Sequence, residues 1–277
     1  MKLILIFLLI TFSSLAAFAQ SDAKKGDSFS EVMSPEKFSI KSVYAVNREY
    51  IMDVTYAMNS IVPGETYPVL YYTDGWVHSD VFNQNGFFLG YGQEIEPVIL
   101  VGISFKGDLS DWGTLRSEDF VPNIKDPNTS SGANRFLDFI KNELIPYVEQ
   151  NYPVDTSDRG IYGYSLGGLF AAWVLKEEPK LFQRYGIGSP SLRHQDFALL
   201  KDQTFLKNIE NLKDVKIYIE YASLEGEPHK SGVESFVEII KTNKSIEWKK
   251  FVIDGSHLAA NPTSCVKALS YLYAKER

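Results

Sequence analysis

The segment "RGIYGYSLGGLFAAW" (159–173) constrains the fold of this chain more than any other stretch. An apolar run ending at Tyr162 leads directly into a serine flanked by glycines, and a small-residue run with Ala171 and Ala172 follows at once. That order predicts a strand, a tight turn and a helix. A serine at the tip of such a turn matches the G-x-S-x-G pattern, whose glycines allow a strained turn between strand and helix. The segment therefore favours an α/β fold with Ser165 at a strand-to-helix turn; an inert serine in a glycine-rich turn is the alternative.

The rest of the chain alternates strand and helix patterns. Two early stretches, "FSIKSVYAVN" and "REYIMDVTYAMN", alternate apolar and polar residues as an antiparallel pair does, whereas "YPVLYYTDG" and "EPVILVGISF" are continuous apolar runs typical of buried parallel strands. Later strands at "RYGIGSP", "DVKIYIEYAS" and "WKKFVID" are separated by helical patterns, and Pro146 is expected to bend one helix or to mark a boundary near Ile145. These patterns predict a mostly parallel central sheet with helices on both faces and an antiparallel N-terminal strand pair.

The first residues have the features of an export signal. Lys2 precedes a short apolar run from Leu3 to Phe12, and Ala17-Phe18-Ala19 fits the small-x-small cleavage rule. We expect a signal peptide at 1–19, a polar linker at 20–34 and a single catalytic domain at 35–277, with an uncleaved anchor as the alternative. No later segment reaches about 18 apolar residues, so stable membrane insertion is not expected. The mature protein is expected in the periplasm or outside the cell.

Charge and cysteine content exclude several classes of protein. A formal net charge of −7 with no basic stripe argues against a nucleic-acid partner. Cys265 is alone, which excludes an intramolecular disulfide and a multi-cysteine metal site. Its place in the apolar pattern of the terminal helix predicts a structural thiol.

A nucleophilic serine needs a base, and the base needs a partnering acid. His257 follows the last predicted strand and precedes the terminal helix, which suits the chain order serine, acid, histidine. The acid should then follow the strand "DVKIYIEYAS". Glu220 lies within that strand, so Glu225 and Glu227 are the candidates, while Asp254 is predicted to be a loop cap.

The elbow also carries a family resemblance. "GIYGYSLGGLFAAW" resembles the nucleophile elbow of the α/β-hydrolase superfamily, specifically the esterase D-like family of siderophore, feruloyl and acetylxylan esterases, S-formylglutathione hydrolases and mycolyltransferases. "PVLYYTDG" and "VILVGISF…LRSEDFVP" resemble further segments of that family. The resemblance implies an α/β-hydrolase fold, with Ser165 as nucleophile and His257 as base. It favours Glu225 as the acid, but Ala222 stands where the family often has glycine, which keeps Glu227 as the alternative.

The resemblance also implies an oxyanion hole and a pocket. The backbone amide of Leu166 and that of Trp76, with Gly75 as the near alternative, would donate to the oxyanion. Tyr164, Trp76 and Trp112, the last in a predicted loop, would give aromatic walls for a flat or sugar-like acyl group.

Other polar residues near this predicted pocket have weaker assignments. His78 is predicted either to line the pocket or to be an exposed loop histidine. Arg116 and Asp119 are expected to form a buried structural pair, and the stretch around 191–211 to form a small lid.

These observations predict an exported serine esterase that works through an acyl-enzyme without a metal or organic cofactor. Its partner would be a small-molecule or polysaccharide ester. The acidic net charge favours a neutral acetyl or feruloyl sugar ester over an anionic ferric siderophore. An acyltransferase using the same triad, and a non-catalytic protein that binds a carbohydrate or siderophore, are the alternatives. The natural ester and the oligomeric state are left open.

Overall fold

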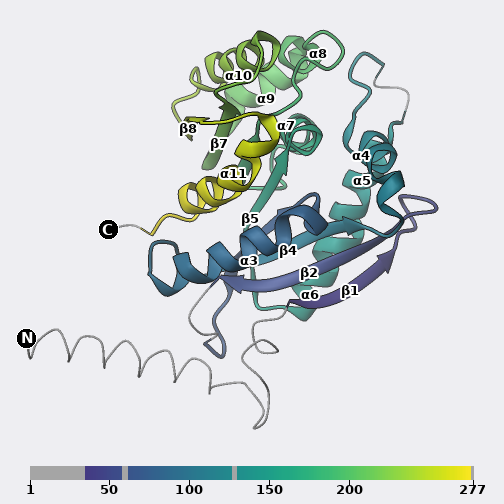
Figure 1. Ribbon diagram of the computed structural model, residues 1–277, viewed down its shortest axis with the longest axis vertical. Helices are drawn as coiled ribbons and strands as arrows, with labels where there is room; N and C mark the ends of the chain where they lie inside the picture. The colour runs from purple at the N-terminus through teal and green to yellow at the C-terminus, as the bar shows by residue number, and fades with distance from the viewer. Residues whose placement is uncertain (1–34, 58–61, 127–129, 276–277) are drawn as a thin grey trace, which may run out of the picture.

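The computed structural model describes residues 35–57, 62–126 and 130–275, and within them the chain forms one eight-stranded sheet flanked by helices (Figure 1). The sheet order is β1-β2-β4-β3-β5-β6-β7-β8. The expected signal peptide (1–19) and linker (20–34) lie outside the described residues.

The strands confirm the predicted sheet. β1 pairs with β2 and β2 with β4 in antiparallel register, and the other neighbours are parallel. The bounds are β1 (Glu36–Lys41), β2 (Glu49–Ala57), β3 (Tyr67–Tyr72), β4 (Val98–Phe105), β5 (Val154–Tyr164), β6 (Arg184–Gly188), β7 (Val215–Ala222) and β8 (Ile246–Ile253).

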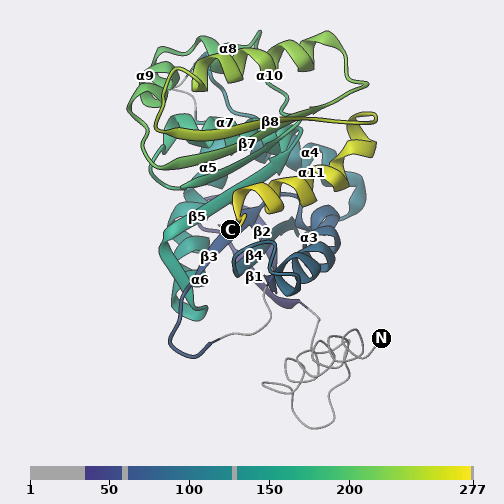
Figure 2. The same ribbon diagram turned by 90° about the vertical axis from the view of Figure 1, so that its left-hand side faces the viewer.

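Helices cover both faces of this sheet. On β3, Val69 and Tyr71 face one core, whereas Leu70 and Tyr72 face the other, because neighbouring side chains of a strand point to opposite faces. α3 (Gly75–Tyr91) and α11 (His257–Leu272) lie beside each other on the Leu70 face (Figures 1 and 2). The other face carries most of the remaining helices: α4 (Trp112–Phe120), α5 (Gly132–Phe139), α6 (Ile145–Asn151), α7 (Leu166–Glu177), α8 (Ala198–Lys201), α9 (Gln203–Asn211) and α10 (Glu227–Ile240).

The helix pattern before the elbow is interrupted, as Pro146 predicted. A short π-helical segment η2 (Ile140–Leu144) follows α5, and α6 begins at Ile145 with Pro146 in its first turn. Proline fits there because first-turn amides have no helical acceptor.

Two helices occupy segments that were expected to be loops. α3 begins directly after the Asp74 turn, and α4 follows a 3₁₀ turn, η1 (Leu109–Asp111), so Trp112 lies on a helix. The terminal helix begins at His257 itself, with Ser256 as its N-cap.

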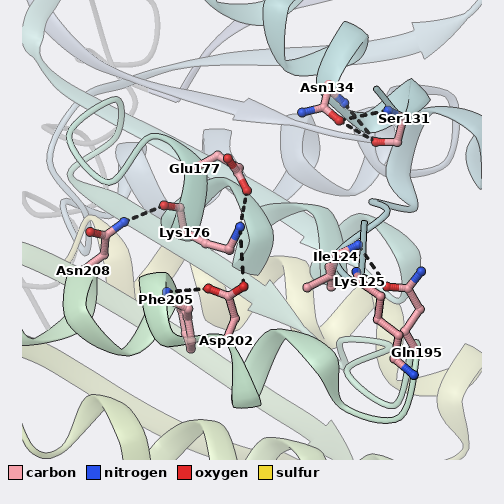
Figure 3. A network of polar contacts seen from close by, with 10 residues as sticks. All are labelled: Ile124, Lys125, Ser131, Asn134, Lys176, Glu177, Gln195, Asp202, Phe205 and Asn208. Carbon is pink, nitrogen blue, oxygen red and sulfur yellow. Dashed lines mark hydrogen bonds and ion pairs between the residues drawn. The ribbon is translucent and has the colours of Figure 1, made fainter. Parts of the chain in front are cut away.

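The stretch expected to be a lid is tied to its neighbours instead (Figure 3). Asp202 caps α9 by accepting from the Phe205 amide at 2.9 Å, and its carboxylate lies 3.8 Å from the Lys176 Nζ of α7. Asn208 donates to the Lys176 carbonyl at 2.7 Å. Gln195 accepts from the amides of residues 124 and 125 at 2.9 and 3.0 Å. These bonds, with the buried Phe205 and Ile209, make the stretch part of the packed domain.

Two further sequence expectations concern the interior and the membrane. Cys265 is fully buried, and burial raises the pKa of its thiol to about 12, which fits a structural thiol. No helix within 35–57, 62–126 and 130–275 has both the length and the apolar character needed to cross a bilayer.

Candidate active site

Ser165 lies on a strained turn between β5 and α7. Its backbone has φ 60° and ψ −112°, a conformation that side-chain-bearing residues rarely adopt. Three hydrogen bonds hold the turn in place. The Ser165 amide donates to the Gly188 carbonyl at 2.9 Å, and its carbonyl accepts from the amides of Leu169 and Ser191 at 3.0 and 3.1 Å. The serine is therefore fixed at the carboxyl end of the parallel strands, where ligands of this fold class bind.

The two glycines of the elbow are required by close approach. A Cβ atom on Gly163 would lie 2.1 Å from the Gly167 carbonyl oxygen. A Cβ on Gly167 would lie 2.3 Å from Thr73 Oγ1, which belongs to the turn after β3. Both glycines of the G-x-S-x-G pattern are thus required because the elbow packs tightly, within itself at Gly163 and against the β3–α3 turn at Gly167.

His257 and Glu225 form a hydrogen-bonded pair near this elbow. Glu225 follows β7, is 7% exposed, and its Oε1 accepts from His257 Nδ1 at the start of α11. Oε2 accepts from the Ala222 amide at 2.7 Å. Because an ionised carboxylate can only accept, the His257 proton belongs on Nδ1, and the Nε2 lone pair is left to act as a base.

Ser189 completes this arrangement, and sequence reasoning missed it. It is fully buried after β6; its hydroxyl donates to Glu225 Oε1 and lies 3.2 Å from His257 Nδ1. Burial acts to raise the pKa of Glu225, but the hydrogen bonds from His257, Ser189 and Ala222 outweigh burial and lower it. Glu225 is therefore ionised at neutral pH. The only signal in the sequence was a serine near the end of the predicted strand "RYGIGSP".

Tyr164, which directly precedes Ser165, connects the elbow to His257. The Tyr164 hydroxyl donates to the His257 carbonyl at 2.5 Å, and the two rings lie 5.1 Å apart. Ser165 Oγ itself makes no hydrogen bond to His257 within the described residues. Such contacts are often longer before substrate binds.

The candidate oxyanion donors are first-turn amides of two helices. Leu166 begins α7, and Gly75 and Trp76 begin α3. Amides in the first turn of a helix have no acceptor carbonyl within the same helix. They are therefore available to donate to an anion. The placement is compatible with donation by Leu166 and Trp76 and leaves Gly75 as the alternative.

Arg116 ties these two turns together. Its guanidinium makes two hydrogen bonds with the Asp74 carboxylate, at 2.8 and 3.0 Å, and a third with the Tyr164 carbonyl at 3.3 Å. Asp74, at φ 57°, directly precedes α3, and Tyr164 directly precedes Ser165. The predicted Arg116–Asp119 pair is therefore wrong. Asp119 instead pairs with Arg48 and accepts from the Tyr50 hydroxyl.

Two residues predicted to line the substrate pocket are buried. His78 is 2% exposed on α3; its Nδ1 lies 2.9 Å from the Thr73 carbonyl and its Nε2 lies 3.0 Å from Asn261 Oδ1. Burial lowers its pKa. His78 is thus neither a pocket residue nor an exposed loop histidine, because α3 turns its side chain inward. Tyr164 is also 2% exposed and supports His257 from the core.

The two tryptophans do form an accessible aromatic surface. Trp76 is 47% exposed and meets Trp112 edge to face, with ring centroids 5.2 Å apart. Both line a shallow pocket of about 180 Å³ beside the start of α3. Trp112 also donates to Asp74 at 3.3 Å, so this surface is continuous with the turn that carries the candidate oxyanion amide.

Among the described residues, neither of the remaining carboxylate candidates contacts His257. Glu227 begins α10 and is exposed, whereas Asp254 accepts from the Ser223 hydroxyl at 2.8 Å, as expected of a loop cap. His229, which sequence reasoning left unassigned, lies in the first turn of α10 with its ring 5.5 Å from that of His257. Burial lowers its pKa.

Comparison with known proteins places the chain in a family. The family model described as "Putative esterase" matches residues 45–257, which include the elbow, Glu225 and His257. The chain belongs to this esterase family. Its relatives include the ferri-bacillibactin esterase BesA of Bacillus subtilis, 30% identical over 185 residues, and the apo-salmochelin esterase of Escherichia coli, 27% identical over 199 residues. These alignments cover 61% and 66% of this chain and 63% and 61% of the two relatives.

Solved structures share the fold of this chain. The BES protein from Bacillus cereus is 25% identical, has a TM-score of 0.77, and is matched over 91% of this chain and 100% of that one. The siderophore hydrolase EstA from Aspergillus nidulans shares the fold at 17% identity, with a TM-score of 0.71 over 90% of this chain and 97% of that one. The predicted α/β-hydrolase fold is confirmed.

Proposed function

We propose that this protein is a serine carboxylic-ester hydrolase in which Ser165 is the nucleophile, His257 the base and Glu225 the acid. The observation that carries the proposal is the strained elbow of Ser165, set at the same end of the sheet as a His257–Glu225 hydrogen bond. A binding protein would have no need for a serine held at φ 60° at the same end of the sheet as an imidazole whose tautomer is fixed.

The proposed reaction uses these groups in order. Ser165 Oγ attacks the ester carbonyl carbon while His257 Nε2 takes the hydroxyl proton. The carbonyl oxygen becomes an oxyanion, which the amides of Leu166 and Trp76 stabilise. The bond to the leaving alcohol then breaks, and the alcohol oxygen receives the proton from His257. Water, deprotonated by His257, hydrolyses the acyl-enzyme and releases the acid.

Glu225 serves this sequence by stabilising the imidazolium form of His257. Its carboxylate is buried and ionised, and three hydrogen bonds fix its position. A fixed charge of this kind needs no reorganisation when the proton arrives, which is the main source of electrostatic catalysis.

For the substrate we propose an ester of the siderophore class. Two relatives are named for esterase activity on ferri-bacillibactin and apo-salmochelin. They favour a siderophore over the neutral sugar ester that the net charge suggested. The Trp76–Trp112 pair, of which Trp76 is exposed, provides an aromatic surface beside the oxyanion turn for such a ligand. Export through a signal peptide at 1–19 is part of the same proposal and is supported by the sequence of that segment.

The test is turnover of p-nitrophenyl acetate by the parent and by Ser165→Ala, with Ser157→Ala as the matched control on the exposed part of β5. We expect Ser165→Ala to lose nearly all turnover and Ser157→Ala to keep it, because triad members act as a unit. Equal slow rates in the parent and Ser165→Ala, with both folded by circular dichroism, would contradict the proposal. Comparing kcat/KM for a siderophore triester and for acetylated or feruloylated sugars then tests the substrate class.

A further inference from the structure

We propose that Glu225, His229 and His257 form a binding site for Zn²⁺ or a similar borderline divalent cation, and that occupancy of this site blocks the esterase. The three side chains each offer one ligand atom, and these atoms lie within 4.8 Å of one another. The proposed metal binding is argued from this geometry, whereas the proposed inhibition also rests on the proposed esterase function.

The three ligands come from adjoining elements at one end of the sheet. Glu225 lies in the turn after β7, His229 in the first turn of α10, and His257 at the start of α11. Glu225 is buried and both histidines are half-buried, so the cluster is screened from bulk water on one side. Glu225 Oε1 and His257 Nδ1 are already in hydrogen-bond contact.

His229 is the residue that turns a catalytic pair into a metal site. Its ring lies 5.5 Å from the His257 ring, and within the described residues its nitrogens make no hydrogen bond. An imidazole without such a partner can offer a lone pair to a metal without losing an existing bond. Neither the elbow nor the proposed oxyanion donors need this side chain.

The donor set suits zinc. Two imidazole nitrogens and one carboxylate oxygen, with a fourth position open to water, are a known zinc ligand set. Bonds of about 2.0–2.1 Å place tetrahedral ligand atoms roughly 3.3 Å apart. Glu225 Oε1 and His257 Nδ1 would therefore move apart from their hydrogen-bond contact, and the half-buried His229 ring would adjust to the same spacing. The Ala222 amide, which donates to Oε2 at 2.7 Å, holds Glu225 in place as an outer-shell bond does in metal sites.

Binding would change the protonation of the pair. The metal takes the position of the proton between His257 Nδ1 and Glu225 Oε1, and the neutral imidazole then carries its proton on Nε2. With Nε2 protonated, His257 has no lone pair to take the Ser165 proton, and Glu225 is held by the metal. Magnesium would not have this effect, because it prefers oxygen ligands in octahedral geometry.

The experiment measures Zn²⁺ binding to the metal-free, Ser165→Ala full chain by calorimetry, with no activity needed. We expect saturable one-to-one binding that weakens by about tenfold or more in His229→Gln and in His229→Ala. His194→Gln is the control, because that ring contacts the Pro122 carbonyl away from the cluster. Absence of saturable binding, or equal binding in both folded His229 variants, would overturn the site.

A second arm measures hydrolysis of p-nitrophenyl acetate by the parent, with each variant compared with its own metal-free rate. Zn²⁺ should inhibit over the concentration range in which it binds, a chelator should restore the rate, and Mg²⁺ should have no effect. Zn²⁺ binding without loss of hydrolysis would overturn the claim that the occupied site blocks the esterase. A parent that lacks turnover counts against the proposed function, and calorimetry alone then decides the metal site.

Discussion

At the scale of single residues, the site depends on a few buried polar contacts around one strained serine. Ser165 lies at φ 60°, a conformation that costs about 1–3 kcal/mol and persists only where the surroundings enforce it. The Gly188 carbonyl and the Leu169 amide provide that enforcement. Glu225 is similarly fixed by Ser189 and Ala222. Local strain and desolvation therefore both occur where the proposed chemistry takes place.

The first prediction separates the two carboxylate candidates. Glu225→Gln should lower kcat by about 10⁴-fold, because an amide can neither fix the His257 tautomer nor stabilise its charge. Glu227→Gln should keep kcat close to the parent value, since that side chain is exposed at the start of α10. Steady-state kinetics of both variants tests this. A larger loss in Glu227→Gln than in Glu225→Gln would reverse the assignment.

The second prediction concerns Ser189 as a positioning residue. Ser189→Ala removes one hydrogen bond to Glu225, worth about 1 kcal/mol, so kcat should fall roughly fivefold with KM little changed. Loss of this donor should also raise the pKa of Glu225, which weakens the ionised form at low pH. The acid limb of the pH–kcat profile should therefore move upward. Ser189→Thr, which keeps the hydroxyl, should recover part of the rate; an unchanged profile in Ser189→Ala would contradict this role.

Sequence reasoning reached the chemistry-bearing residues of this site but not their supports. The elbow was predictable because glycine spacing reports a close backbone approach, and the strand-to-helix order fixes where Leu166 lies. Glu225 and Glu227 could not be separated, because both follow the same strand and only the start of α10 turns one of them to solvent. Ser189 could not be found from local pattern, since its role depends on β6 lying next to β7.

At the scale of elements, the strands were predictable and two helices were not. Strands such as β4 are buried on both faces and therefore appear as continuous apolar runs. α3 escaped prediction because glycines interrupt its pattern. Gly86 is small for a tertiary reason: a Cβ there would lie 3.0 Å from both Ala57 and Leu100. Because α3 packs so closely on β2 and β4, it needs a glycine at this position, and glycines make its sequence resemble that of a loop.

The third prediction tests close packing at the elbow. Gly163→Ala should lower the free energy of unfolding by about 1–3 kcal/mol or more, because its Cβ would lie 2.1 Å from the Gly167 carbonyl oxygen. Gly113→Ala, on α4 with no atom within 4 Å of the added Cβ, should cause no loss. Urea unfolding of both variants measures the difference. Equal stabilities would mean that the elbow relaxes freely.

At the scale of the whole molecule, the sheet separates two cores, and one of them contains an unpaired acid. Glu220 is fully buried on β7, on the same face as Tyr218, and neither carboxyl oxygen has a hydrogen-bond partner within the described residues. Burial raises its pKa from 4.5 to about 8, opposed by the nearby Ser264 hydroxyl. Glu220 therefore carries a proton at neutral pH and weakens the fold when it ionises.

The fourth prediction follows from the sign of that shift. Between pH 4.5 and about 8 the unfolded chain loses the Glu220 proton while the folded chain keeps it, so this residue lowers the free energy of unfolding as pH rises. Glu220→Gln should remove that contribution, and its stability relative to the parent should increase over this window and level off above it. Denaturant unfolding across the window tests this, with the exposed Glu238→Gln as control. A constant difference between Glu220→Gln and the parent would show that Glu220 does not titrate this way.

The most direct test of the central claim is to locate the nucleophile chemically. The parent, Ser165→Ala and Ser157→Ala would be treated with a fluorophosphonate and analysed by intact mass and peptide mapping. We predict one adduct per chain, on Ser165, in the parent and in Ser157→Ala, and none in Ser165→Ala. An adduct on another residue, or no adduct on the folded parent, would contradict a serine esterase built on this elbow.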